Sequence, residues 1–204
     1  MAKIGTLFTV SAPSGAGKTS LLKAVAGQLD HFSISVSTTT RTMRPGEQDG
    51  VDYHFATQQD FNNRVAQGEF LEHAEVFGNM YGTSVLDVER ALDAGDDIVL
   101  EIDWQGAQQI KKRMPSVVSI FILPPSRKTL EERLQGRGQD DAEVIANRMA
   151  SAINEISHYT EYDYVIINDD FEVAKAELSS IISAERLKLA KQQLKHRQLI
   201  DDLL

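Results

Sequence analysis

The chain has 204 residues, no cysteine and 42% apolar residues, which suits one packed domain without disulfides or thiolate metal sites. With 30 acidic and 21 basic residues its formal net charge is −9, which argues against non-specific nucleic-acid binding. The apolar run at 120–123 is far too short to span a membrane. The N-terminus resembles no signal peptide, so we expect a cytoplasmic protein.

The first half of the chain begins with a short strand at 6–11, a loop of small residues at 12–17 and an amphipathic helix at 18–29. The composition then changes, and an insertion with its own small sheet is expected to reach about residue 92. Its antiparallel strands are predicted from short alternating runs at 32–36, 53–55 and 70–76.

The second half of the chain returns to longer apolar runs. Strands are expected at 98–102 and 117–123, because near-continuous apolar runs are typical of parallel strands buried on both faces. Helices are expected after both, the second over 126–154 with a break at 136–138. Strands that alternate with helices predict an α/β fold with a parallel sheet.

The C-terminal region is expected to contain a last buried strand at 164–167 and one long amphipathic helix from residue 171 onward. Its apolar stripe contains Leu178, Ile181, Ile182 and Leu189. Such a helix packs on its own domain or forms a contact between copies of the chain, and the sequence leaves a homo-oligomer open.

A phosphate-binding loop is the strongest motif. Residues 12–19 read APSGAGKT and match the pattern G-x-x-x-x-G-K-[ST] except for the alanine at its first position. The glycines allow successive amide N–H groups to surround a phosphate at a helix N-terminus, the lysine can reach the outer phosphates, and the threonine can bind Mg²⁺. The predicted nucleotide-binding residues are Ala12, Pro13, Ser14, Gly15, Ala16, Gly17, Lys18 and Thr19.

Two carboxylates follow the strand at 98–102. Strand alternation places Glu101 and Asp103 on one face, where a carboxylate near a phosphate loop can act on Mg²⁺. The carboxyl end of a parallel strand is also where open α/β sheets bind ligands. The alternative is a strand end that simply emerges into solvent.

Arginines gather in two places. Residues 37–46 contain Arg41, Arg44 and several hydroxyl groups but no carboxylate, which suits a phosphate monoester as well as a solvated loop. Arg133 and Arg137 lie one helical turn apart and Arg148 follows on the next helix. These three would suit a lid over a migrating phosphoryl group, or an ordinary surface helix.

Taken together, the motifs resemble guanylate kinases over nearly the whole chain. Besides the phosphate loop, the matching segments are STTTR at 37–41, RPGE at 44–47, GVDYHF at 50–55, GEFLE at 68–72, YGT at 81–83, EIDWQG at 101–106, RLQGRG at 133–138 and YVIIND at 164–169.

The resemblance implies one domain over 1–204 in three parts. These are a P-loop core at 1–36, 93–125 and 158–204, a GMP-binding insertion of mixed or antiparallel strands at about 37–92, and a helical lid at about 126–157. It also implies the Mg²⁺-dependent transfer of a phosphoryl group from ATP to GMP, and to dGMP.

Site residues carried over from the resemblance fall into four groups. Lys18, Arg133, Arg137 and Arg148 would be catalytic, and Asn168 would lie near the adenine of ATP. Thr19 and Glu101 would serve the metal. The residues expected at GMP are Ser37, Arg41, Arg44, Tyr53 and Tyr81 for the phosphate, and Glu72, Thr83 and Asp103 for the guanine.

Two other functions remain open on the sequence alone. One is a related kinase of a ribose phosphate or another small molecule. The other is a non-catalytic binding module of the same fold. The presence of Glu72 with Asp103 argues against the first, and the intact lysine and lid arginines argue against the second.

Overall fold

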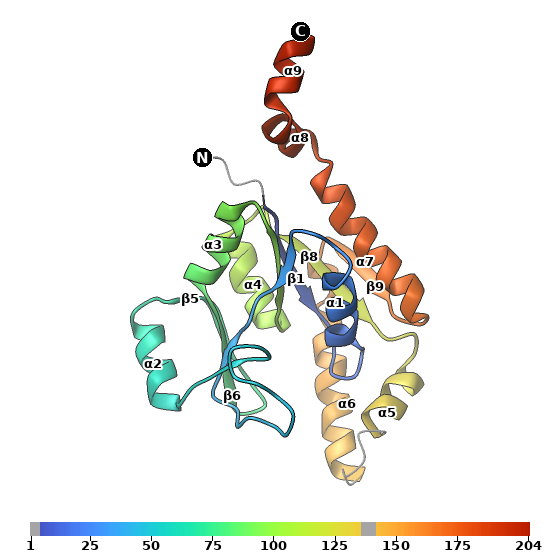
Figure 1. The fold of residues 1–204 in the computed structure, drawn as a ribbon. Helices are drawn as coiled ribbons and strands as arrows, with labels where there is room; N and C mark the ends of the chain where they lie inside the picture. The colour runs from blue at the N-terminus through green and yellow to red at the C-terminus, as the bar shows by residue number, and fades with distance from the viewer. Residues whose placement is uncertain (1–4, 136–141) are drawn as a thin grey trace.

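The computed structural model describes residues 5–135 and 142–204, and it shows an α/β fold with two sheets (Figure 1). The larger sheet is parallel, as predicted, with the strand order β2-β7-β1-β8-β9. Its strands are β1 (Leu7–Ser11), β2 (Phe32–Ile34), β7 (Asp97–Glu101), β8 (Val118–Leu123) and β9 (Tyr164–Ile167).

Helices cover both faces of this sheet. Apolar side chains alternate along its strands, so each face has its own core. Val10 and Val99 pack in the core beneath α1 and α7, whereas Ile98 and Leu100 pack beneath α3 and α4. These four helices are α1 (Lys18–Ala26), α7 (Phe171–Arg186), α3 (Val85–Ala94) and α4 (Trp104–Arg113). The alternation turns Glu101 toward the α1 side of the sheet.

The smaller sheet has the strand order β4-β3-β6-β5 and is mixed, since β3 and β4 are parallel and the other pairs antiparallel. Its strands are β3 (Thr38–Thr39), β4 (His54–Phe55), β5 (Phe70–Val76) and β6 (Asn79–Ser84). The expectation that 32–36 belongs to this antiparallel sheet is wrong. Strand β2 lies beside β7 in the parallel sheet.

Two helices of this region were not expected, namely α2 (Gln58–Ala66) and α3. Each begins after a hydroxyl side chain that accepts a hydrogen bond from a backbone N–H three residues later, Thr57 from Asp60 and Ser84 from Asp87. These capping signals were present in the sequence. Phe61 of α2 is fully buried and stacks on Phe70 of the small sheet.

A helical pair, α5 (Arg127–Gln135) and α6 (Ala142–Ser157), forms a separate layer with its own small core. Leu130 and Leu134 of α5 pack against Met149 and Ala152 of α6. The predicted break at 136–138 lies outside the described residues. A short 3₁₀ turn, η1 (Tyr159–Glu161), leads from α6 to β9.

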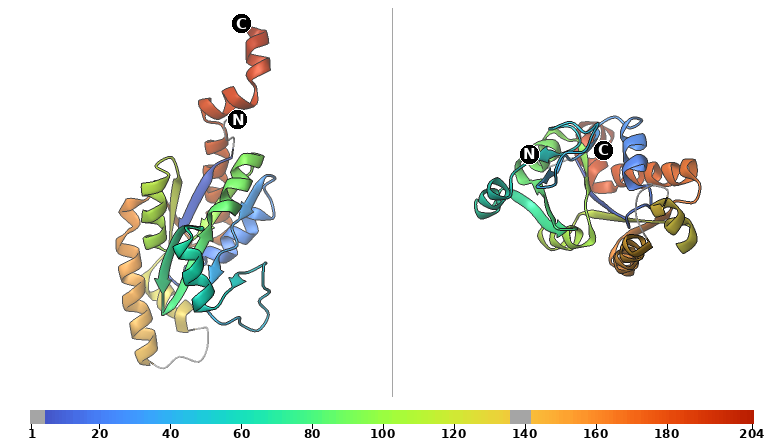
Figure 2. Two further views of the ribbon diagram at one scale, coloured as in Figure 1. Left: turned by 90° about the vertical axis from the view of Figure 1, so that its left-hand side faces the viewer. Right: turned by 90° about the horizontal axis from the view of Figure 1, so that it is seen from below.

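The C-terminal segment differs from its prediction, because helix α7 ends at Arg186. Its buried stripe ends there with the sheet beneath it, and Leu189 is 74% exposed. The side chain of Gln192 donates to the Arg186 carbonyl group at 2.9 Å, and Lys188 is extended. Helices α8 (Leu189–Lys195) and α9 (Arg197–Leu203) then extend beyond the body of the molecule (Figures 1 and 2).

Strand β9 also differs from the buried strand that was predicted. It lies at the edge of the sheet, and of its four residues only Ile166 is buried. Within the described residues, no helix is both long and apolar enough to cross a bilayer.

Candidate active site

The phosphate loop connects β1 to α1, as predicted. Gly15 and Gly17 have φ angles of +89° and +88°, which side chains disfavour and glycine adopts without cost. Ala12 does not have a positive φ, so alanine fits at the first position of the motif. The loop therefore has the backbone that an anion-binding turn requires.

Asn168, which directly follows the edge strand β9, fixes the loop. Its buried side-chain amide donates to the Ala16 carbonyl oxygen at 2.7 Å, and a Cβ atom on Gly17 would lie 2.6 Å from that amide nitrogen. Arg133 of α5 donates to the Asn168 carbonyl oxygen at 3.3 Å. These contacts connect the loop, the end of β9 and the α5–α6 layer.

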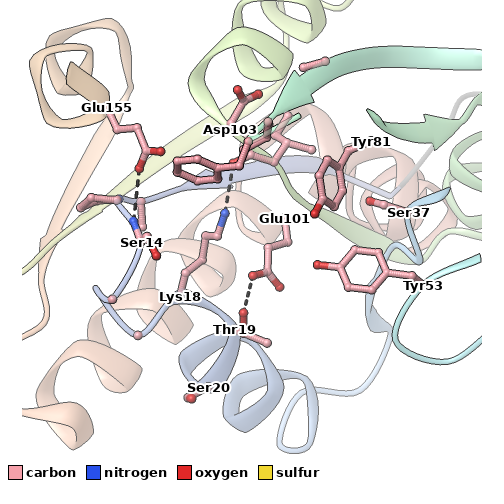
Figure 3. Close-up of a pocket in the computed structure, with 18 of the residues that line it drawn as sticks. Ser14, Lys18, Thr19, Ser20, Ser37, Tyr53, Tyr81, Glu101, Asp103 and Glu155 are labelled. Carbon is pink, nitrogen blue, oxygen red and sulfur yellow. Dashed lines mark hydrogen bonds between the residues drawn. The ribbon is translucent and has the colours of Figure 1, made fainter. Parts of the chain in front are cut away.

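Lys18 and Thr19 begin helix α1 and point toward the carboxyl end of β7. The Lys18 ammonium group donates to the Ile102 carbonyl oxygen at 3.2 Å, and the Thr19 hydroxyl group donates to the Glu101 carboxylate (Figure 3). The hydroxyl and carboxylate oxygens therefore lie together beside the loop. Oxygen atoms of these types are the ligands that Mg²⁺ prefers.

The opposite wall of the cavity comes from the small sheet and the segments around it. Tyr53 and Tyr81 direct their hydroxyl groups toward Glu101, with Ser37 beside them (Figure 3). Their rings meet edge to face with 5.9 Å between centroids. Burial raises the pKa of Tyr53, so this hydroxyl group stays a neutral hydrogen-bond donor.

Glu72 is the most deeply buried carboxylate of the cavity, with 3% of its surface exposed. It accepts a hydrogen bond of 2.6 Å from the hydroxyl group of Thr83, which is fully buried behind it. Burial raises the pKa of Glu72 to about 7, against the effect of that hydrogen bond. Gly106 leaves the space, because a Cβ atom there would lie 2.6 Å from a Glu72 oxygen.

Asp103 lies at the N-terminus of α4 on the same cavity. One of its oxygens accepts from the Gly106 backbone N–H and the other from the Gln105 side chain, both at 2.9 Å. These two donors hold the side chain in one orientation. Glu72 and Asp103 both line this cavity, and the charge of Asp103 adds to the rise in the pKa of Glu72.

Arg41 and Arg44 belong to the loop after β3, and both contact Glu47. The Arg41 guanidinium group lies 2.7 Å from a Glu47 oxygen and 5.3 Å from the Tyr53 ring centroid. The Arg44 backbone N–H donates to the other Glu47 oxygen at 2.8 Å. Arg41 lowers the pKa of Glu47, so the carboxylate stays charged and holds the guanidinium group.

A cavity of about 300 Å³ joins most of the predicted site. Its lining includes the loop residues from Ala12 to Thr19 apart from Ala16, together with Ser37, Tyr53, Glu72, Tyr81, Glu101 and Asp103. Arg41, Arg44, Thr83, Arg133, Arg148 and Asn168 lie outside this lining. Arg137 lies outside the described residues.

Arg133 nevertheless has an unusual environment beside the loop. Its Nη1 atom is buried and has no hydrogen-bond partner within residues 5–135 and 142–204. A buried guanidinium nitrogen without a partner costs free energy unless a ligand supplies an acceptor. The guanidinium group of Arg133 is therefore placed to bind an anion at the phosphate loop.

Six lining residues were not predicted as site residues, namely Ser20, Ala74, Val76, Phe77, Ile102 and Glu155. Phe77 has a positive φ of +49° before Gly78 at the β5–β6 turn, and a two-residue turn between alternating runs was the available signal. Glu155 belongs to α6 and accepts from the Ser14 backbone N–H at 3.2 Å. No local sequence signal indicated that contact.

A phosphate loop on a parallel sheet, a Thr–Glu oxygen pair and a second polar wall define a P-loop phosphotransferase. The guanylate kinase family profile matches residues 5–185. A guanylate kinase of Vibrio parahaemolyticus is 57% identical over 98% of both chains, and one of Saccharophagus degradans is 57% identical over the full length of both. The crystal structure of guanylate kinase from Anaplasma phagocytophilum superposes with a TM-score of 0.76, at 38% identity over 94% of this chain and 91% of that chain.

The chain therefore belongs to the guanylate kinase family. This result confirms the resemblance drawn from the sequence motifs, and it identifies the chain as an enzyme that transfers phosphoryl groups.

Proposed function

We propose that this chain transfers the γ-phosphoryl group of ATP to GMP, and that the cavity between the phosphate loop and the small sheet is where the two nucleotides meet. The observation that supports this most directly is the buried Glu72–Thr83 pair in the same cavity as the loop. The family and its full-length relatives support the same reaction.

Guanine recognition is assigned to Glu72, Thr83 and Asp103. Guanine presents N1–H and an exocyclic NH₂ group on one edge, and a buried carboxylate can accept from both. Adenine has an acceptor at N1, so the same carboxylate would repel it. Selectivity of this kind is strong because the wrong base leaves a buried polar group unpaired. A small substrate without such donors would leave these acceptors unused, which disfavours the small-molecule kinase.

The GMP phosphate is assigned to Ser37, Arg41, Arg44, Tyr53 and Tyr81. The tyrosine hydroxyl groups and Ser37 already face the cavity (Figure 3), and the Arg41 guanidinium group lies over the Tyr53 ring. A guanidinium group binds a phosphate through two parallel hydrogen bonds, so a phosphate can replace Glu47 as the partner of Arg41. The phosphate would then bring the loop after β3 toward the cavity.

The ATP phosphates are assigned to the loop from Ala12 to Thr19, with Lys18 on the outer phosphates. Arg133, Arg137 and Arg148 are assigned to the phosphates from the lid, and Asn168 to the adenine side. The unpaired Arg133 nitrogen supports its part of this assignment. We place the domain division at the boundaries given above, with a core, an insertion and a lid.

Magnesium is assigned to Thr19 and Glu101. These side chains fit the ion, because a hydroxyl and a carboxylate oxygen face each other beside the loop. Two protein oxygens suit Mg²⁺, which usually keeps waters and binds substrate phosphates at its other positions. The ion would supply positive charge to the ATP phosphates.

The reaction needs no covalent enzyme intermediate. An oxygen of the GMP phosphate attacks the γ-phosphorus in line, the bond from this phosphorus to the bridging oxygen breaks, and ADP leaves with the electron pair. The work of the chain is to hold both nucleotides and to neutralise charge on the transferring group. Lys18 and the lid arginines are the residues placed for that task. We place this reaction in the cytoplasm.

The test is an assay of ADP release with ATP and Mg²⁺, and with GMP, AMP, CMP or UMP in turn. Turnover with GMP alone is expected. Glu72→Gln is expected to raise the KM for GMP far more than the dissociation constant for ATP. If ATP binds but no monophosphate is turned over, the small-molecule kinase takes precedence. If ATP does not bind, the non-catalytic module does.

A further inference from the structure

Glu155 places a carboxylate at the phosphate loop. Its Oε2 atom accepts a hydrogen bond from the Ser14 backbone N–H at 3.2 Å (Figure 3). The residue belongs to α6 and lines the same cavity as Lys18 and Asp103. None of the roles assigned above uses this side chain.

The surroundings of Glu155 indicate why it lies there. A carboxylate that accepts from a loop amide offers the same chemistry as a phosphate oxygen, namely a negative charge and lone pairs. Burial raises the pKa of the Glu155 carboxyl group, and Lys18 and the Ser14 hydrogen bond act in the opposite direction. The contact with Ser14 therefore places this carboxyl group where the loop is suited to bind an anion.

Helix α6 also carries Arg148, seven residues before Glu155. Seven residues are close to two full turns, so the two side chains share a face of the helix. Under the proposed function Arg148 contacts the ATP phosphates. One helix face thus carries a cation suited to a phosphate and an anion that contacts the phosphate loop.

We propose that Glu155 is a positioning residue that holds α6 on the empty phosphate loop, and that the phosphate chain of ATP displaces it. This inference rests on the proposed ATP site at this loop. Because ATP must replace an internal competitor, the apparent affinity for ATP is lower than that of a loop without one. The residues assigned to GMP line the opposite wall of the cavity, so GMP binding does not compete with Glu155.

The first experiment measures nucleotide binding to the full chain by calorimetry. Glu155→Gln keeps the size of the side chain but removes its charge. It is expected to bind ATP about three- to tenfold more tightly, the range for a weakened hydrogen bond to a charged group. The dissociation constant for GMP is expected to stay within about twofold. Glu177→Gln, at an exposed position of α7, makes the same change in net charge and is expected to leave ATP binding unchanged.

The second experiment measures amide hydrogen exchange in the peptide that contains Ser14. In Glu155→Ala this peptide is expected to exchange faster than in the wild-type chain without nucleotide, and at the same rate when both are saturated with ATP. A purely structural role would leave the difference in place in both states.

Three results would overturn the proposal. One is ATP binding by Glu155→Gln that is unchanged or weaker, and another is equal tightening in Glu177→Gln. The third is a wild-type chain that does not bind ATP, which would overturn the proposed ATP site as well. In the first two cases the proposed function would stand and the role of Glu155 alone would fail.

Discussion

Replacing Glu72 by glutamine tests the burial of this carboxylate separately from catalysis. Glutamine has nearly the same shape and can still accept the hydrogen bond from Thr83, but it does not titrate. The difference in unfolding free energy between Glu72→Gln and the wild-type chain therefore isolates the titration of one buried group. Ionisable residues that do not interact with Glu72 contribute equally to both proteins and cancel.

The magnitude follows from the shift in pKa. Folding raises the pKa of Glu72 from 4.5 to about 7, so the folded state binds more protons than the unfolded state between these values. The stability that this group contributes is fully present below about pH 4.5 and is lost as the pH rises through about 7. Over that window the wild-type chain is expected to lose about 3 kcal/mol relative to Glu72→Gln.

The assay is urea unfolding of both proteins at pH values from about 4.5 to 8, followed by circular dichroism. The stability difference is expected to move steadily in favour of the glutamine variant as the pH rises. A constant difference across the window would refute the raised pKa. A difference that moves in the opposite direction would mean that Glu72 is held as a carboxylate by a partner.

Further predictions concern the loop and the core. Lys18→Ala is expected to remove about 3 kcal/mol of transition-state stabilisation, seen as a fall of about a hundredfold or more in kcat/KM for ATP, whereas activity within threefold of wild type would exclude the assigned role. Gly17→Ala and Gly46→Ala both place alanine at a φ near +90°. Of these two positions, only Gly46 leaves open space for a Cβ atom among the described residues. Gly17→Ala is therefore expected to lower the Tm further than Gly46→Ala and also to abolish ATP binding. Asp97→Ala removes the buried partner of Arg186 and is expected to lower the unfolding free energy in urea by about 2 kcal/mol. Because Asp97 begins β7 at the end away from the cavity, kcat is expected to stay unchanged, and a fall in kcat would contradict this placement.

The phosphate loop could be predicted from the sequence because its chemistry is local. Gly15, Gly17, Lys18 and Thr19 lie within five consecutive residues, and the strand before them and the helix after them fix their geometry. The period of two along a strand likewise predicted that Glu101 and Val99 share a face. The structure adds that α1 covers this face, which brings Glu101 to Thr19.

The guanine end required more than a local pattern. Glu72 and Asp103 could be named from the resemblance, but their shared cavity depends on packing between the small sheet and α4. Burial also decides the charge of Glu72, because desolvation acts only when the neighbouring segments exclude water. The lack of a Cβ atom at Gly106 leaves space for this carboxylate, and this effect also depends on how α4 packs against the small sheet.

Errors in the predicted elements have a related cause. The amphipathic pattern continues past Arg186, yet α7 ends there because the sheet beneath it ends, and Leu189 has no core to enter. Strand β9 reads as buried because all four of its residues are apolar or aromatic, but its position at the edge of the sheet exposes most of them.

The sequence by itself determined the phosphate loop, the α/β alternation and the family, since each depends on residues close together or on motifs that match in order. Only the tertiary structure decided that Glu155 meets Ser14, 141 residues earlier in the chain. The physical reason is that a hydrogen bond between distant segments, like the charge of a buried group, depends on how helices and sheets pack. No period or spacing along the chain carries that information.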